Sequence, residues 1–265
     1  MRKYWKVVRN TWDEMLMYRL SLVMWRVRIT IHVLTLYFLW LAVLPESSDQ
    51  LFGYTQASML TYILVLNLVS ALVTPTRSYA IGDDIVSGNL SYMLLKPIDY
   101  FFYWFSKDVG DRVADVLFSI IELSLLFFFL RPPFFIQLDP LYLLLFFIAM
   151  GFSLVLYFFF NLLLGFIGFW SAEIWAPRFI FYTIVSFFAG GYFPLDILPQ
   201  PFFALFHALP FGNLLYFPVK IYLGQLSLPE VVNGLVVSFG WVLFFSVLIQ
   251  LVWRRGLKVY TAQGG

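Results

Sequence analysis

Few residues of this sequence have the side chains that enzymes use for catalysis or metal binding, and those few stand apart. The chain contains no cysteine and two histidines, His32 and His207. Without cysteine there is no disulfide, no cysteine-ligated zinc and no thiol nucleophile. The sequence also lacks the H-E-x-x-H, G-x-S-x-G and G-x-x-x-x-G-K-[ST] patterns, which hold zinc, a serine nucleophile and nucleotide phosphates. We therefore expect no catalytic residue, no metal site and no ATP hydrolysis in this chain.

Three ionisable residues lie in or beside apolar runs, and Glu122 is the most costly, because it falls about halfway along the run 113–130. A carboxylate at membrane depth usually faces an interior cavity or a partner group. Glu122 is therefore either a neutral glutamic acid that hydrogen-bonds a neighbouring helix or part of a substrate or proton path. His32 and Glu173 lie near the ends of such runs, and we interpret His32 as an interfacial or hydrogen-bonded histidine.

The composition indicates which elements must hold these residues. Of the 265 residues, 62% are apolar and 12% are charged, whereas soluble domains carry about 25% charged residues. Surface area grows too fast with chain size for a soluble fold to bury this much apolar side chain, so lipid must surround most of the chain. The apolar runs are long and unbroken, as in 141–170, which indicates helices rather than the alternating strands of a barrel.

We predict an all-α membrane protein with six transmembrane helices, since each span needs about 20 residues. Pro45, Pro75, Arg131 and Arg254 each follow an apolar run and mark where a span ends. The expected spans are 22–44, 56–74, 113–130, 141–170, 176–193 and 231–253.

Residues 1–21 carry too many charges for a span and predict an amphipathic helix in the lipid headgroup region. Trp5, Val8 and Trp12 recur at helical spacing, while Lys3 and Lys6 lie elsewhere on the helix. Two tryptophans on one face favour a membrane-bound helix over the alternative, a solvated helix that leads into the first span.

The basic residues predict the orientation, because cytoplasmic segments carry an excess of lysine and arginine. With the N-terminus in the cytoplasm, all 17 basic residues except Arg131 and Lys220 fall on the cytoplasmic side. We therefore expect a multi-pass protein of the inner (plasma) membrane with both termini in the cytoplasm. The segment 194–229, rich in proline and aromatic residues, then lies outside, and we expect it to re-enter the outer leaflet as a hairpin.

The long cytoplasmic loop 75–112 predicts a docking surface. Asp83 or Asp84 caps a short helix, Gly88 interrupts it with a backbone conformation suited to glycine, and Pro97 ends it. Its apolar edge is formed by Leu90, Met93 and Leu94. The alternative is a structured loop without a partner. The aromatic residues that follow, within 100–112, are expected to lie along the inner membrane interface before the third span begins.

The segment 81–97 resembles the cytoplasmic signature of the type-2 ABC exporter permeases. In that signature an acidic residue and a hydrophobe precede a glycine, leucines, a basic residue and a proline. The matching residues are Asp84, Ile85, Gly88, Leu90, Leu94, Leu95, Lys96 and Pro97. A second match lies between the last two spans, where such permeases often carry a glycine and several prolines. Those residues are Gly191, Pro194, Leu198, Pro199 and Pro210.

This resemblance covers nearly the whole chain and implies one permease domain over residues 1–265, without a fused ATPase. It implies a second permease subunit, identical or paralogous, and a separate ABC ATPase subunit that holds ATP and Mg²⁺, so that this chain binds no cofactor itself. Membrane lipid is an expected partner and nucleic acid is not. The residues implied to couple to the ATPase are Asp83, Asp84, Ile85, Gly88, Leu90, Leu94, Lys96 and Pro97.

We predict the transmembrane subunit of an ATP-driven exporter that moves a small amphipathic compound, drug or lipid-like substrate out of the cytoplasm. Two alternatives stay open. The first is a polytopic membrane enzyme acting on lipids, although the sequence shows no clustered set of acids or histidines for it. The second is a non-transporting assembly subunit. Within the exporter hypothesis, the sequence does not choose between small amphipathic compounds and lipid or polysaccharide.

Overall fold

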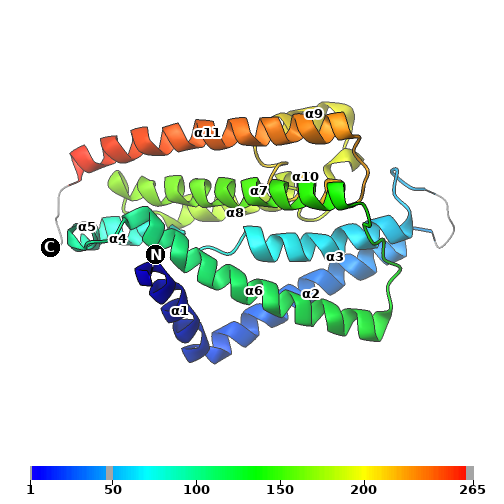
Figure 1. Cartoon of the computed structure of the whole chain (residues 1–265), viewed down its shortest axis with the longest axis horizontal. Helices are drawn as coiled ribbons and strands as arrows, with labels where there is room; N and C mark the ends of the chain where they lie inside the picture. The colour runs from blue at the N-terminus through cyan, green and yellow to red at the C-terminus, as the bar shows by residue number, and fades with distance from the viewer. Residues whose placement is uncertain (1, 46–49, 261–265) are drawn as a thin grey trace.

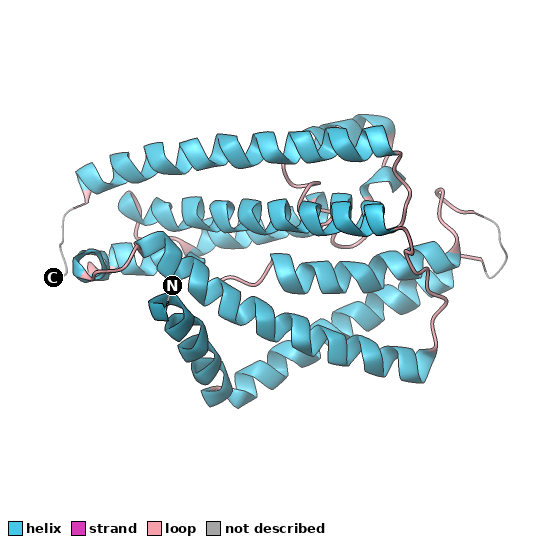
Figure 2. Ribbon diagram, viewed as in Figure 1, coloured by secondary structure: helices cyan, strands magenta, loops and turns pink. Residues whose placement is uncertain are grey.

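The computed structural model describes residues 2–45 and 50–260, which fold into a bundle of long helices that lie side by side (Figure 1). Within these residues the backbone is helical or irregular, apart from one isolated β-bridge (Figure 2). The all-α prediction is therefore confirmed. Five helices are long and apolar enough to cross a membrane: α2 (Arg19–Val43), α3 (Gln56–Val73), α6 (Tyr100–Leu130), α7 (Pro140–Phe166, continued by η2, Ile167–Phe169) and α11 (Leu228–Val259).

Shorter elements gather at the two ends of this bundle (Figure 1). One end, called here the α4–α5 end, holds the start of α1, the end of α11, and the elements η1, α4 and α5. The other, the α10 end, holds α9 and α10. The bounds of the shorter elements are α1 (Arg2–Met17), η1 (Ser78–Ala80), α4 (Ile81–Val86), α5 (Asn89–Leu95), α8 (Trp175–Phe188), η3 (Leu195–Ile197), α9 (Gln200–Ala208) and α10 (Tyr216–Tyr222).

Helix α6 corrects the prediction of a separate interfacial piece before the third span. It is one continuous helix of 31 residues, about 46 Å long at 1.5 Å per residue, whereas the hydrocarbon core is about 30 Å thick. The Asp99 carboxylate accepts a hydrogen bond from the Phe102 amide at 2.8 Å and starts the helix. Its other end is Arg131, at φ +46°, directly before two prolines. The aromatic run that begins at Tyr100 therefore forms the first turns of α6.

Helix α1 lies against the first half of α6. Thr11 is buried, and a Cβ atom added to Gly110 of α6 would come within 2.9 Å of Thr11, so the two backbones cross closely there. Trp5 points away and is 71% exposed. The N-terminal helix ends at Met17, with one residue between it and α2, and α6 covers one of its faces. That it lies in the headgroup region stays a prediction.

Helix α8 is shorter than the expected span 176–193. Its 14 residues extend about 21 Å, and the chain turns at Gly190, which has φ +81°. At its start, the Ile174 side chain lies so close to Gly82 of α4 that a Cβ atom added to Gly82 would come within 2.6 Å of it. At its end, the Tyr62 hydroxyl of α3 donates a hydrogen bond to the Gly190 carbonyl at 2.8 Å. Helix α8 therefore runs toward the α10 end, and it is shorter than the five long helices.

The α10 end is held together by Lys220 of α10, which is 5% exposed. Its ammonium group donates hydrogen bonds to the Asp196 carboxylate at 2.7 Å, the Tyr54 hydroxyl at 3.0 Å and the Gln225 side chain at 2.6 Å. Burial, and the Asp196 carboxylate beside it, raise the pKa of the Tyr54 hydroxyl well above its usual range. Three separate stretches of the chain, which contain Tyr54, Asp196 and Lys220 with Gln225, thus meet at one lysine.

Candidate functional site

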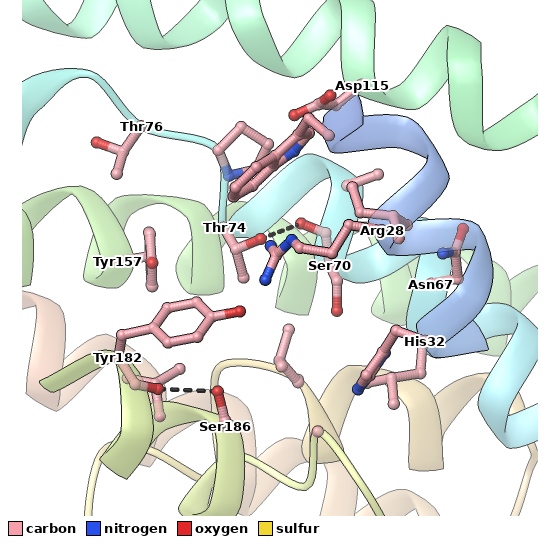
Figure 3. Close-up of a pocket in the computed structure, with 18 of the residues that line it drawn as sticks. Arg28, His32, Asn67, Ser70, Thr74, Thr76, Asp115, Tyr157, Tyr182 and Ser186 are labelled. Carbon is pink, nitrogen blue, oxygen red and sulfur yellow. Dashed lines mark hydrogen bonds between the residues drawn. The ribbon is translucent and has the colours of Figure 1, made fainter. Parts of the chain in front are cut away.

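A cavity of about 630 Å³ lies between α2, α3, α7 and α8 (Figure 3). Apolar side chains such as Leu36 and Leu66 line it together with polar ones, among them Arg28, His32 and Asn67. The volume falls within the roughly 300–1,000 Å³ of small-molecule sites, and the mixed lining suits an amphipathic ligand.

The polar side chains of this cavity come from three helices. Figure 3 shows Arg28 of α2 reaching toward Ser70 and Thr74, at the end of α3, with Tyr182 and Ser186 of α8 across the cavity. The Arg28 guanidinium carbon lies 4.0 Å from the centre of the Trp25 indole ring, which is a cation–π contact. One helical turn further along α2, His32 also lines the cavity, and its ring centre lies 5.6 Å from that of Tyr192.

A cluster of charged side chains on α2 and α6 borders the cavity. Arg26 donates two hydrogen bonds to the Glu122 carboxylate, each at 2.7 Å, which form a bidentate ion pair. It also donates to Asp115 at 2.9 Å and to the Ser119 hydroxyl at 3.2 Å. The Arg26 side chain is 9% exposed and those of Asp115 and Glu122 are 18%. Arg26, Asp115 and Ser119 line the cavity.

This geometry gives Glu122 a partner on a neighbouring helix, as one of the two interpretations expected, and that partner is Arg26 of α2. Two N–H groups of one guanidinium that donate to one carboxylate form a strong bidentate contact. Sequence reasoning placed Arg26 with the interfacial charges and did not single out Asp115. A signal was nevertheless present, because Asp115, Ser119 and Glu122 are spaced four and three residues apart and so share one face of a helix.

The other ionisable residues flagged by the sequence have local roles or lie outside the described part. The Glu173 carboxylate accepts a hydrogen bond from the Trp175 amide at 3.1 Å, at the start of α8. The side chain of His207 lies outside the residues that the structure describes. Among the described residues, no group of three or more histidines, aspartates and glutamates could hold a metal ion.

At the α4–α5 end, two short helices carry the residues of the cytoplasmic signature. Gly88 separates α4 from α5 with φ +78°, which confirms that this position needs a glycine conformation. The Asp84 carboxylate accepts hydrogen bonds from the Asn89 side chain at 2.7 Å and from the Tyr100 hydroxyl at 3.0 Å. Asp84 therefore fixes α4 to both α5 and α6, whereas the Asp83 side chain is 63% exposed.

The apolar edge of this unit differs from the predicted one. Leu90 and Met93 are 0% and 5% exposed, because they belong to a hydrophobic core shared with α6, α7 and α11. The exposed apolar side chains of α5 are instead Tyr92 at 62%, Leu94 at 45% and Leu95 at 84%. These three residues, together with Asp83, are called the α4–α5 surface below.

The remaining signature residues tie the unit to its surroundings. Ile85 is buried in the same core. The Lys96 ammonium group lies 4.3 Å from the centre of the Tyr92 ring, and the Pro97 carbonyl accepts a hydrogen bond from Lys3 of α1 at 2.7 Å. The unit is therefore packed onto the helix bundle on one side and exposed on the other.

Comparison with known proteins identifies the family. A family model described as ABC-2 family transporter protein matches residues 30–264, which include both signature segments. No curated protein matches the chain. Because the family match covers most of the sequence, the chain belongs to the ABC-2 transporter family and is a multi-pass membrane protein of the permease type. The resemblance drawn from 81–97 and from the prolines near the α10 end is confirmed.

Proposed function

From its place in the ABC-2 transporter family, we propose that the chain is the transmembrane subunit of an ATP-driven exporter, which moves a small amphipathic or lipid-like compound out of the cytoplasm. The observation that carries the proposal is the α4–α5 surface, an exposed apolar patch at the more basic end of the bundle. Exposed apolar side chains at a polar end of a protein favour a protein partner. The partner we propose is a separate ABC ATPase subunit that holds ATP and Mg²⁺.

The orientation belongs to the same proposal. The α4–α5 end also holds the basic residues of α1 and those at the end of α11, such as Arg254. Lysine and arginine remain in excess on the cytoplasmic side, so the α4–α5 surface faces the cytoplasm, where the ATPase and its ATP are. Both termini of the chain are then cytoplasmic, and the membrane is the inner (plasma) membrane.

The packing of the α4–α5 unit supports a role in transmitting force. A Cβ atom added to Gly82 would lie 3.1 Å from the Gly165 carbonyl of α7, so α4 crosses the end of α7 in close contact. Tyr100 of α6 stacks on Trp253 of α11, with ring centres 5.7 Å apart. A push on the unit therefore displaces the ends of three long helices together, as a nucleotide-driven change between two states of the bundle requires.

The site also bears on the two alternatives. The family supports a transport subunit over a lipid-modifying enzyme, and the charged cluster around Arg26 is an ion-paired network rather than a free acid beside a nucleophile. A non-transporting assembly subunit would use the same ATPase contact. It differs in one outcome, because its reconstituted complex would hydrolyse ATP without moving any compound.

The test is purification of the tagged chain from its native membranes, followed by identification of bound ATPase. Leu95→Asp puts a charge into the proposed contact and should reduce bound ATPase about tenfold or more, since burying an unpaired charge costs at least about 1.4 kcal/mol. The matched control is Leu138→Asp, because Leu138 is 82% exposed and lies between α6 and α7 at the α10 end. Equal retention of ATPase by both variants would contradict the proposal.

A further inference from the structure

We propose that the cavity binds an anionic amphiphile, with Arg28 contacting the negatively charged headgroup and the apolar walls holding the chain. The inference rests on the proposed function, since the occupant of this cavity would be the compound transported. It goes further by naming the sign of its charge.

The three arginines that line the cavity differ in their partners. Arg26 is paired with Glu122 and Asp115. Arg178 hydrogen-bonds the Tyr79 carbonyl and lies 3.6 Å from the Asp83 carboxylate. Among the described residues, Arg28 makes no ion pair, and its guanidinium contacts Trp25. A guanidinium held against an aromatic ring keeps its N–H groups free to donate at its edge.

Residues with hydroxyl groups lie near Arg28 in the cavity. Figure 3 shows its side chain directed across the cavity toward Ser70 and Thr74, and Thr76 also lines this region. The Thr74 and Thr76 hydroxyls already donate to the Ser70 carbonyl and the Asp108 carboxylate. Among the described residues here, the donors left for a phosphate or carboxylate oxygen are therefore the Arg28 guanidinium and the Ser70 hydroxyl. The carboxylate that lines the cavity, Asp115, is ion-paired with Arg26, so a cationic headgroup beside Arg28 would meet its charge without a free carboxylate to balance it.

The cavity extends along α2. Leu36 follows Arg28 by eight residues, or about 12 Å of helix, and both residues line the cavity. Leu66 of α3 and Val185 of α8 line it as well. An alkyl chain whose headgroup lies at Arg28 would therefore pass His32 and reach these three apolar side chains.

The test measures equilibrium binding of radiolabelled decyl phosphate to the purified chain in phosphatidylcholine nanodiscs, without ATPase and after subtraction of empty nanodiscs. We expect saturable binding that Arg28→Gln weakens about tenfold or more, as expected for the loss of a hydrogen bond to a charged group. Arg28→Lys keeps the charge and should weaken binding less. Arg254→Gln, which removes an exposed arginine at the end of α11, is the matched control and should leave binding unchanged.

Two competitors define the ligand class. Decyltrimethylammonium has the same chain with a cationic headgroup and should not displace decyl phosphate. Inorganic phosphate lacks the chain and should displace it only at far higher concentration. Displacement by decyltrimethylammonium at similar concentrations, or equal effects of Arg28→Gln and Arg254→Gln, would overturn the proposal. Effective displacement by inorganic phosphate would overturn the role of the apolar walls.

A second measurement does not depend on the arginine variants. Because the chain has no cysteine, Thr74→Cys introduces a single thiol at the cavity wall. Decyl phosphate should slow its reaction with a maleimide, and decyltrimethylammonium should not. Absence of protection by decyl phosphate would count against the inference. Since neither experiment includes the ATPase, a failure here alongside intact ATPase binding would overturn this inference and leave the proposed function standing.

Discussion

Arg26 and Glu122 are 96 residues apart in the chain and form a bidentate ion pair beside the cavity. The pair also involves Asp115, so that one guanidinium faces two carboxylates. Breaking a buried ion pair by removing one partner is more costly than never having the pair, because an uncompensated charge is left behind. The order in which the Arg26 and Glu122 variants lose stability therefore shows which groups of the cluster carry charge.

Arg26→Gln should destabilise the chain by about 3–5 kcal/mol, because it leaves two carboxylates without their cation. Glu122→Gln should cost less, about 1–3 kcal/mol, since Arg26 keeps Asp115 and the amide oxygen still accepts one hydrogen bond. The double variant should be more stable than Arg26→Gln alone. Thermal unfolding of the purified variants in detergent measures these differences. Equal stability of Arg26→Gln and wild type would show that the ion pair contributes nothing.

At the scale of elements, the α10 end depends on a buried lysine. Lys220→Met should destabilise the chain by about 2–3 kcal/mol, somewhat less than a fully buried pair, because the Asp196 side chain is 29% exposed. The matched control is Lys258→Met in the last turn of α11, where the lysine is exposed. Unfolding temperatures in detergent give the comparison. If the two variants have the same unfolding temperature, Lys220 does not hold the segments at the α10 end together.

Hydropathy and length predict the long helices well, because a membrane span needs a long apolar run. They do not predict how such helices begin and end. Asp99 caps α6 fourteen residues before the apolar run starts, and α1 covers the polar turns in between. The glycine conformation at Gly190 ends α8 early, and apolar composition carries no sign of it.

Some features of the candidate site could likewise be predicted from the sequence and others could not. The special backbone of Gly88 was predictable, because it depends on neighbouring residues in the chain. The burial of Leu90 was not, since helical spacing shows which residues share a face but not which face the rest of the chain covers. The contact between Arg26 and Glu122 could not be predicted for the same reason. It joins residues of two helices whose packing no local pattern specifies.

At the scale of the whole molecule, the two ends of the bundle should lie on opposite sides of the membrane. Ser87 lies between α4 and α5, Gln200 begins α9, and both are exposed. In whole cells, a membrane-impermeant maleimide should label Gln200→Cys, and should label Ser87→Cys only after permeabilisation. Labelling of Ser87→Cys in intact cells would reverse the orientation and remove the α4–α5 surface from the ATPase.

The proposed export function depends on one contact, that of the α4–α5 surface with an ABC ATPase. The most direct measurement is crosslinking from single cysteines in this cysteine-free chain, in native membranes, with a short bifunctional reagent that joins a thiol to a nearby lysine. Leu95→Cys should give an ATPase adduct, and Leu138→Cys, equally exposed at the opposite end, should give none. An ATPase that co-purifies with the Leu95→Cys chain but crosslinks only from Leu138→Cys, or from neither position, would contradict the account.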